Sequence, residues 1–272
     1  MSSSFGALVD TRLRVMTWNL WWRFGPWEQR RPAIAATLAA VDADIVCLQE
    51  VWGGRDGEFA AELAQKLGFQ HASAARLDYE GVTFGNAVLS RWPIAHSDSR
   101  PLPTLEENDE LRTVLHALVD GPRGPIQVFT THLNWRFDHS AVRQAQVRLV
   151  AEWVAAAGPR TFPPVLCGDL NAPPDSDEIR MLTGKAAVAV PKLVFYDAWE
   201  VAGTGGAGVT WSNANPHARG DLEPDRRIDY ILVGWPKTGG VGQVLSCRVA
   251  GREPVDGMVP SDHYAVVAEL RY

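Results

Sequence analysis

The sequence predicts one α/β (α+β) domain built from two packed, mainly antiparallel β-sheets with helices on their outer faces. Three observations lead to this prediction. Short apolar runs punctuated by Gly and Pro recur along the whole chain and indicate roughly eight to ten strands. About three segments have helical spacing, too few for a βα barrel and too uneven for a doubly wound sheet. No linker separates two differently patterned blocks, so residues 1–272 are expected to form a single domain.

The N-terminal elements follow a strand–helix–strand order. Residues 13–18 predict a strand that ends at Asn19. The next segment predicts an amphipathic helix with Pro32 near its start, where proline is tolerated. Residues 45–51 then predict a buried strand with Glu50 at its exit. A carboxylate directly after apolar residues is costly to bury unless it is solvated, paired or metal-bound.

The middle of the chain predicts one helix and three strands. Apolar residues at helical spacing predict a helix over residues 59–67, closed by Gly68 as a C-cap. Residues 87–90 predict a strand that begins just after Asn86. Residues 113–131 predict a β-hairpin, because two apolar runs flank a turn rich in Gly and Pro.

A helix and a buried strand lead to the central motif. Residues 141–157 have helical spacing, and residues 165–167 form an apolar run that ends at a glycine. Asp169 and Asn171 follow. In an extended backbone both side chains would reach into one space, where a carboxylate and an amide could hold a water and an anionic oxygen. The alternative is that both residues only form an Asx-type turn ahead of two prolines.

The last third of the chain combines a long loop with two final strands. Residues 195–227 are rich in Gly, Asn and Pro and predict either a substrate-contacting loop or an ordered surface loop. Residues 228–233 and 264–270 predict the last strands. We find no internal repeat in the sequence. The loop residues considered for substrate contact are Trp211, Asn213, Asn215 and His217.

Charge and cysteine content narrow the function classes. A net charge of −6 and a pI near 5.7 provide no general attraction for nucleic acid or anionic lipid, although a local basic patch would permit nucleic-acid binding. Cys47, Cys167 and Cys247 are widely spaced and form no zinc motif. Their odd number argues against a disulfide framework, so buried free thiols are expected.

The chain shows no sign of a secretory or membrane segment. Residues 1–10 lack the basic start and long apolar region of a secretory signal and are expected to form a flexible tail. No apolar run is long enough to cross a bilayer. We therefore expect a cytoplasmic protein. No partner-binding surface stands out, so we expect a monomer.

Polar residues recur where apolar strands end, and this pattern is the main clue to function. One such residue can be a turn former or a satisfied buried group, but strands need no charged caps. Two packed sheets can bring such strand ends to one edge and form a cleft lined by carboxylates, histidines and amides. The positions are Asn19, Glu50, His132, Asp169 with Asn171, Asp229, and Asp262 with His263.

Such a cleft predicts a hard divalent cation. Crowded carboxylates repel one another unless a cation lies among them. Oxygen ligands without a cysteine or histidine cluster favour Mg²⁺, with Mn²⁺ as the alternative, over zinc. The histidines then remain free to handle protons and phosphate oxygens near neutral pH. Together these groups suit the attack of water on a phosphoester.

Ordered motifs span nearly the whole chain. They are Thr17-Trp18-Asn19, Leu48-Gln49-Glu50-Val51, Thr131-His132-Leu133, Gly168-Asp169-Leu170-Asn171, Arg227-Ile228-Asp229-Tyr230 and Ser261-Asp262-His263-Tyr264. This series resembles the signatures of the endonuclease/exonuclease/phosphatase superfamily, which includes deoxyribonucleases, abasic-site endonucleases, neutral sphingomyelinases and inositol-polyphosphate phosphatases. The resemblance implies a four-layered α/β sandwich and a metal-dependent phosphoesterase. It also implies that Glu50 is the main metal ligand with Asn19 beside it, and that Asp262 holds the same metal or a second one.

The resemblance implies catalytic roles as well. Asp169 is expected to orient or deprotonate the attacking water. Asn171 and His132 are expected to hydrogen-bond the phosphate and stabilise charge that develops in the transition state. His263 is expected to pair with Asp229, which fixes its tautomer, and to contact the phosphate as acid, base or electrophile. Which histidine is the general acid stays open.

Departures from the family pattern bear on the substrate. Trp21 occupies a position where abasic-site endonucleases typically have an acidic residue, which favours another substrate. Arg112, Asn86 and Trp211 are the candidate substrate contacts, and a solvated edge-strand arginine is the alternative for Arg112. Negative charge and tryptophan-rich surroundings favour a small or lipid-derived phosphoester. The alternatives are a Mg²⁺-dependent nuclease acting on DNA or RNA and a non-catalytic binding module that keeps the fold.

Overall fold

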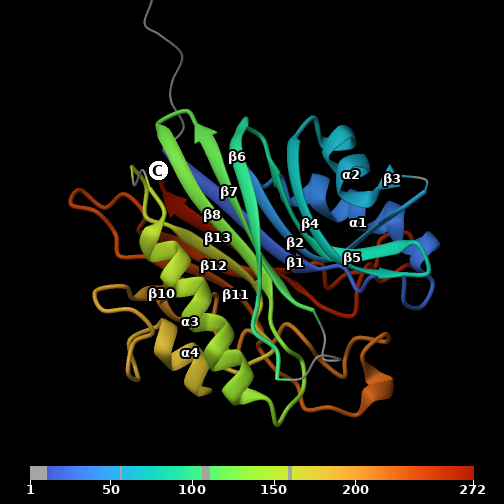
Figure 1. Cartoon of the computed structure of the whole chain (residues 1–272). Coiled ribbons are helices and arrows are strands. Elements are labelled where there is room, and N and C mark those ends of the chain that lie inside the picture. The colour runs from blue at the N-terminus through green and yellow to red at the C-terminus, as the bar shows by residue number, and fades with distance from the viewer. Residues whose placement is uncertain (1–10, 56, 106–110, 159–160) are drawn as a thin grey trace, which may run out of the picture.

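Two stacked β-sheets form the centre of the molecule, and helices cover their outer faces (Figure 1). The computed structural model describes residues 11–55, 57–105, 111–158 and 161–272, so the tail expected over residues 1–10 lies outside the described residues. Helices α1 (Trp27–Val41) and α2 (Phe59–Leu67) pack on one sheet, and α3 (Ser140–Ala156) and α4 (Asp177–Leu182) pack on the other. These layers form the four-layered α/β sandwich that the sequence predicted.

The first sheet has seven strands, with a parallel pair at its centre. Strands β1 and β2 run parallel, and the flanking pairs are antiparallel. The order is β12 (Val244–Ala250), β13 (Ala265–Arg271), β1 (Arg12–Asn19), β2 (Ile45–Gly54), β5 (Val82–Ser90) and β4 (Gln70–Tyr79), with the short β3 (Gly57–Glu58) paired to β2.

The second sheet has six strands and the same plan. Strands β8 and β9 form its parallel pair, and the flanking pairs are antiparallel. The order is β10 (Phe195–Asp197), β11 (Asp229–Gly234), β9 (Val165–Asp169), β8 (Gly124–His132), β7 (Thr113–Gly121) and β6 (Ile94–Pro101).

Two of the helices connect the parallel strands. Helix α1 (Trp27–Val41) joins β1 to β2, and α3 (Ser140–Ala156) joins β8 to β9. No helix of the described residues is long and apolar enough to span a membrane. The other helices are α2 (Phe59–Leu67), α4 (Asp177–Leu182), α5 (Ala198–Ala202) and a 3₁₀ turn (Arg219–Asp221).

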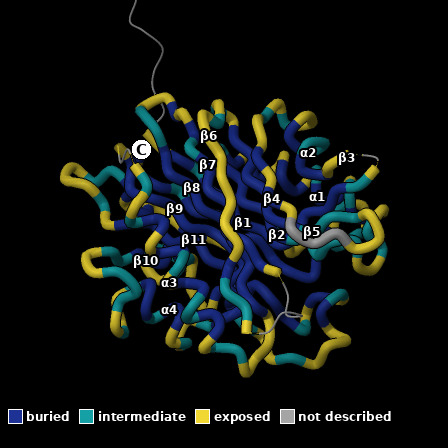
Figure 2. Tube along the Cα trace, viewed as in Figure 1, coloured by how far each residue is buried: buried dark blue, intermediate teal, exposed yellow. Residues whose placement is uncertain are grey.

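The core lies in three layers, one between the sheets and one under each pair of helices. Figure 2 shows most strands of the two sheets as buried, with β6 (Ile94–Pro101) as an exposed exception. The three cysteines are buried and free, as expected. One polar bridge crosses the central layer, because the wholly buried Gln49 donates from Nε2 to Thr17 Oγ1 at 3.1 Å and to Thr130 Oγ1 at 2.9 Å.

The two parallel β-α-β units repeat each other in structure and in sequence. Residues 17–24 read Thr-Trp-Asn-Leu-Trp-Trp-Arg-Phe, and residues 130–137 read Thr-Thr-His-Leu-Asn-Trp-Arg-Phe. The expectation of no internal repeat is therefore wrong. The equivalent pairs are Val15 with Ile45 and Thr17 with Cys47 in the first sheet, and Val128 with Val165 and Thr130 with Cys167 in the second.

Other expectations also need correction. The described residues contain thirteen strands, more than the sequence predicted. Strand β6 was missed because nearly all its side chains are exposed and it has no apolar run. Helix α1 begins at Trp27, so Pro32 lies in its second turn rather than near its start. Asn86 lies inside β5 rather than before it.

Candidate active site

The polar residues predicted at strand ends meet at one edge of the two sheets. Strands β1, β8 and β9 end there with Asn19, His132 and Asp169. Strands β11 and β13 are antiparallel to their neighbours β9 and β1, so they begin at this edge. Asp229 is the first residue of β11, and His263 precedes β13. The expectation that these two residues follow strands is wrong, but antiparallel pairing brings them to the same edge.

Glu50 reaches the site from within β2 rather than from its end. Its backbone is left-handed, with φ of 53°, and the pairing of β2 with β5 shifts register between Leu48 and Val51. Its Oε1 accepts a hydrogen bond from Asn19 Nδ2 at 3.2 Å. Its Oε2 is buried without a hydrogen-bond partner among the described residues. Burial and the negative charge of Asp262 raise the pKa of Glu50 to about 7.

Asn19 and Asp262 complete the predicted metal-binding group. Asn19 Nδ2 also donates to Asp169 Oδ2 at 3.0 Å, and its Oδ1 accepts from the amide of Trp21 at 2.9 Å. Asp262 Oδ1 lies 3.2 Å from Ser261 Oγ. Burial raises the pKa of Asp262 to about 6. Both pKa values are raised mainly because the carboxyl groups are buried, and a bound cation would offset this cost of ionisation.

Asp169 is the centre of the site. Its Oδ1 accepts from the amide of Asn171 at 2.9 Å. Its Oδ2 lies 3.4 Å from Nε2 of His132 and 3.6 Å from Nε2 of His263. Burial opposes ionisation, but the two imidazoles and the donors Asn19 and Asn171 outweigh burial and lower the pKa of Asp169. Asp169 is therefore a carboxylate that accepts hydrogen bonds from several directions.

Asn171 reconciles the two interpretations that the sequence left open. Its φ is 50°, and its amide closes a turn on the Asp169 carboxylate, as the Asx-turn interpretation predicts. The backbone is not extended here, so strand geometry does not align the two side chains. The side-chain Nδ2 donates to the carbonyl of Leu133 at 3.1 Å. The turn itself brings Asn171 next to Asp169.

His132 is held in one tautomer by Arg112. A guanidinium only donates, so the 2.7 Å contact from Arg112 Nη1 makes Nδ1 of His132 the acceptor. The ring proton then resides on Nε2, the atom that faces Asp169. Burial and the positive charge of Arg112 lower the pKa of His132 well below its usual value. The solvated alternative for Arg112 is wrong, because the side chain is buried and lies over the Phe84 ring.

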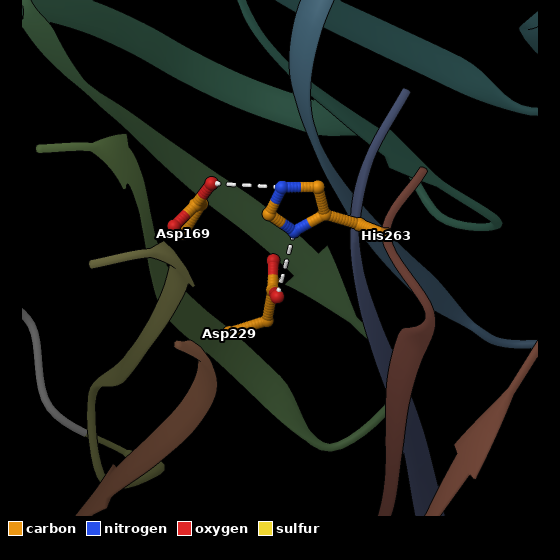
Figure 3. Close-up of side chains that lie close together, drawn as sticks. All are labelled: Asp169, Asp229 and His263. Carbon is orange, nitrogen blue, oxygen red and sulfur yellow. Dashed lines mark hydrogen bonds and ion pairs between the residues drawn. The ribbon is translucent and has the colours of Figure 1, made fainter. Parts of the chain in front are cut away.

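The charge around His263 is opposite to that around His132 (Figure 3). Its Nδ1 lies 2.9 Å from Asp229 Oδ2 and its Nε2 faces Asp169, so the ring lies between two carboxylates. Burial alone would lower its pKa, but the charges of Asp229, Asp169 and Asp262 raise it well above the usual value. The trio in Figure 3 offers ligand atoms within 4.8 Å of one another. Because Nδ1 already contacts Asp229, this trio is better suited to protonating His263 than to binding a metal.

The other predicted substrate contacts make structural interactions near the site. Asn86 is buried and donates from Nδ2 to the carbonyl of Thr113 at 2.9 Å. Trp211 is buried and pairs through its backbone with His263. In the same loop, Asn215 Nδ2 donates at 2.8 and 2.9 Å to the carbonyls of the two residues before His263. Contact of these residues with substrate stays a prediction.

Several residues that hold the strand ends in place were not predicted from the sequence. Trp18 Nε1 donates to the carbonyl of His263 at 3.0 Å, and Ser261 Oγ donates to the carbonyl of Asn19 at 2.7 Å. Arg30 is wholly buried and donates five hydrogen bonds to backbone carbonyls. The overlooked signal for Arg30 is a cationic residue on the buried face of an otherwise apolar helix.

Stacked sheets whose carboxylates, amides and histidines converge at one edge define a class of α/β proteins. Residues 16–263 match the model of the endonuclease/exonuclease/phosphatase family, and the chain belongs to that family. Its members are generally hydrolases that act on phosphoesters.

Two relatives by sequence illustrate the range of the family. The uncharacterized protein YbhP of Escherichia coli is 33% identical over 173 residues, which cover 58% of this chain and 66% of that protein. A putative neutral sphingomyelinase of Drosophila melanogaster is 28% identical over 193 residues, which cover 62% of this chain and 41% of that protein. The matched segment is thus less than two thirds of each relative's length.

Solved structures share the fold. An endonuclease/exonuclease/phosphatase from Beutenbergia cavernae is 28% identical with a TM-score of 0.73, over 96% of this chain and 72% of that chain. TDP2 of D. rerio, complexed with a single-strand DNA product, has a TM-score of 0.75 over 97% of this chain and 100% of that chain. Its identity of 19% makes that a likeness of fold alone.

Proposed function

We propose that this protein is a divalent-metal-dependent phosphoesterase that hydrolyses a phosphodiester or phosphomonoester by attack of an activated water. The observation that carries the proposal is the environment of Asp169, whose Oδ2 faces the Nε2 atoms of two histidines with oppositely shifted pKa values. A neutral imidazole, a protonated imidazole and a carboxylate around one point can bind a phosphate, donate a proton and orient a water.

The residues at this edge fit a hard cation. Glu50 has a buried oxygen without a hydrogen-bond partner among the described residues, and Glu50 and Asp262 both have raised pKa values. Glu50, with Asn19 and Asp262, would hold Mg²⁺ or Mn²⁺ through oxygen atoms. Such an ion supplies Lewis-acid polarisation of a phosphoryl oxygen.

Asp169 orients the attacking water in this proposal. Its lowered pKa makes it a weak base but a permanent acceptor. A water that donates to Asp169 would have its lone pair directed away from the carboxylate, toward a phosphorus atom held by the neighbouring groups. Asn19 and Asn171 restrict the carboxylate by donating to its two oxygens, so the water is aligned before the reaction.

The two histidines divide the remaining work. His263 is protonated and carries its proton on Nε2 at the site, so it can donate to the leaving oxygen. Asp229 holds the ring and stabilises its charge. His132 is neutral and offers an Nε2–H to a non-bridging phosphoryl oxygen. This division makes His263, rather than His132, the general acid.

We further propose that the substrate is small or lipid-derived. The net charge of −6 disfavours a polyanion. The surroundings of the site are aromatic, with the Phe84 ring 6.2 Å from the His132 ring and 6.2 Å from the Trp22 ring. A nuclease remains the alternative that the experiments must test.

The chemistry can be tested with bis(p-nitrophenyl) phosphate and the corresponding monoester, each with Mg²⁺, Mn²⁺ or EDTA. We expect metal-dependent hydrolysis that Asp169→Asn abolishes and that Asp98→Asn, a change of an exposed aspartate on β6, leaves intact. Hydrolysis that persists in EDTA, or equally in both variants, would contradict the proposal. Silence on these and on phospholipid and nucleotide substrates would favour the binding module.

A further inference from the structure

Two loops that share a Trp-Arg-Phe sequence leave the active-site edge. Residues 22–24 and residues 135–137 both read Trp-Arg-Phe. The first loop follows β1 just after Asn19, and the second follows β8 just after His132. They therefore occupy equivalent places in the two repeated units, one on each sheet, beside the proposed reaction centre.

A buried arginine holds each loop from beneath. Arg30 is 0% exposed and donates to four carbonyls within residues 20–24, at distances from 2.7 to 3.1 Å. Arg143 is 4% exposed and donates to two carbonyls within residues 134–136, at 3.2 and 2.6 Å, while it pairs with Glu178. Each arginine is the fourth residue of the helix that follows its loop. Both loops are thus held by hydrogen bonds from a buried arginine to backbone carbonyls.

The loops direct aromatic rings into solvent. Phe24 is 48% exposed, Trp135 45% and Phe137 55%. Tyr79, at the end of β4, is 67% exposed, and its ring centroid lies 6.4 Å from that of Trp22. We call Phe24, Tyr79, Trp135 and Phe137 the aromatic rim.

Support of the catalytic residues explains the buried arginines but not the exposed rings. Small or polar side chains could occupy the outer positions of both loops without disturbing Asn19 or His132. Large exposed rings on fixed loops are unfavourable in water and mark a surface that binds something apolar. Through Trp22 and Phe84, ring contacts also connect Phe24 of the aromatic rim to His132.

The charge of the loops identifies the kind of partner. Each loop has one arginine, Arg23 or Arg136, the second loop also has Asp138, and Arg226 lies over the Phe137 ring. Aromatic rings beside a few arginines suit the headgroup region of a bilayer, where rings lie at the boundary and guanidinium groups reach phosphate. A small charge at the rim and a negative protein disfavour DNA and strongly anionic lipid.

We propose that the aromatic rim docks the active-site edge onto the surface of a zwitterionic phospholipid bilayer. The substrate would then be the phosphodiester of a phospholipid headgroup, presented from the bilayer to Asp169 and the two histidines. This inference rests on the phosphoesterase proposed above, but docking is a binding property that can be measured without turnover.

Flotation with phosphatidylcholine vesicles in EDTA tests docking by itself. We expect the full chain to float with the vesicles with little dependence on salt. Combined Phe24→Ser, Trp135→Ser and Phe137→Ser changes should weaken binding by about 100-fold, because three interfacial rings are removed. The matched control is Trp235→Ser, since Trp235 is 71% exposed just after β11 and lies at the opposite end of that strand from Asp229.

Further variants and ligands keep the test decisive. The ring-to-ring changes Phe24→Tyr, Trp135→Tyr and Phe137→Tyr should retain binding, and unchanged melting would show that all variants are folded. Equal flotation of the serine variant, flotation only with anionic vesicles, or salt-sensitive binding of single-stranded DNA through the same residues would overturn docking. Hydrolysis of bis(p-nitrophenyl) phosphate without flotation would overturn docking alone. Flotation without hydrolysis of any phosphoester would support docking and count against the proposed function.

Discussion

His132 and His263 face the same oxygen of Asp169 from opposite sheets, yet their pKa values are shifted in opposite directions. Both rings are buried, so burial does not explain the difference. The second ring nitrogen does: in His132 it contacts a guanidinium, and in His263 it contacts a carboxylate. The charge at the second ring nitrogen, together with Asp169 and Asp262 around His263, therefore shifts the two pKa values in opposite directions.

This comparison predicts that the two histidines are unequal in catalysis. His263→Ala should lower kcat by about 10³-fold or more, because it removes the general acid. His132→Ala should lower kcat by about 10²-fold, because it removes one hydrogen bond to the transition state. Steady-state kinetics on an activated diester measures both losses. Circular dichroism must show intact folds, and equal losses would refute the division of roles.

The substitution Asp229→Asn tests the environment of His263, because it removes the carboxylate that contacts Nδ1. We expect kcat to fall by about 10²-fold or more and the alkaline limb of its pH profile to move to lower pH. The sign follows from the raised pKa of His263: without the negative charge of Asp229 the ring loses its proton at a lower pH. A profile that keeps its shape would mean that His263 is not the titrating acid.

The substitution Arg112→Met tests the environment of His132, because it removes the guanidinium that contacts Nδ1. Removal of the guanidinium should raise the pKa of His132, so the ring becomes protonated at a higher pH than in the native protein. We expect roughly a tenfold loss of activity near neutral pH, and ¹⁵N NMR of the imidazole should show the upward shift of its titration. Arg100→Met, at an exposed arginine of β6, serves as the control and should leave that titration unchanged.

The substitution Asn215→Ala tests how the backbone before His263 is held in place. His132 is part of a strand, whereas the segment before His263 depends on two hydrogen bonds from the buried Asn215. Loss of the Asn215 side-chain amide should lower the free energy of unfolding by about 1–3 kcal/mol in urea titrations. The neighbouring Asn213→Ala should cost less, because Asn213 contacts only its own loop. Similar losses would argue against this dependence.

The sequence was sufficient for the features that depend on local patterns. The apolar strands and the polar residues beside them predicted the two-sheet sandwich, and the order of the motifs predicted the family. The convergence of Asn19, His132, Asp169, Asp229 and His263 followed from a simple assumption that strand ends share an edge. The structure brings these residues together through mixed parallel and antiparallel pairing.

The sequence was insufficient where a residue depends on distant neighbours. The left-handed backbone of Glu50 arises from a register shift against β5, which no local pattern reveals. The opposite pKa shifts of the histidines depend on Arg112 and Asp229. Each of these residues is distant in sequence from the histidine that it contacts. Strand β6 could not be predicted from apolar runs, because nearly all of its residues are exposed.

Gln49 has a consequence beyond its own hydrogen bonds. Its side chain bonds to Thr17 within its own sheet and to Thr130 of the facing sheet, so it links the two repeated units across a mainly apolar layer. Apolar surfaces can slide past each other, but a hydrogen bond between Gln49 and Thr130 forms only when the two sheets are correctly aligned. Half of the reacting groups belong to each sheet, so their spacing is set when the two halves dock. Gln49, although it is not among the proposed reacting groups, thereby helps to set the distance between His263 on one sheet and Asp169 on the other.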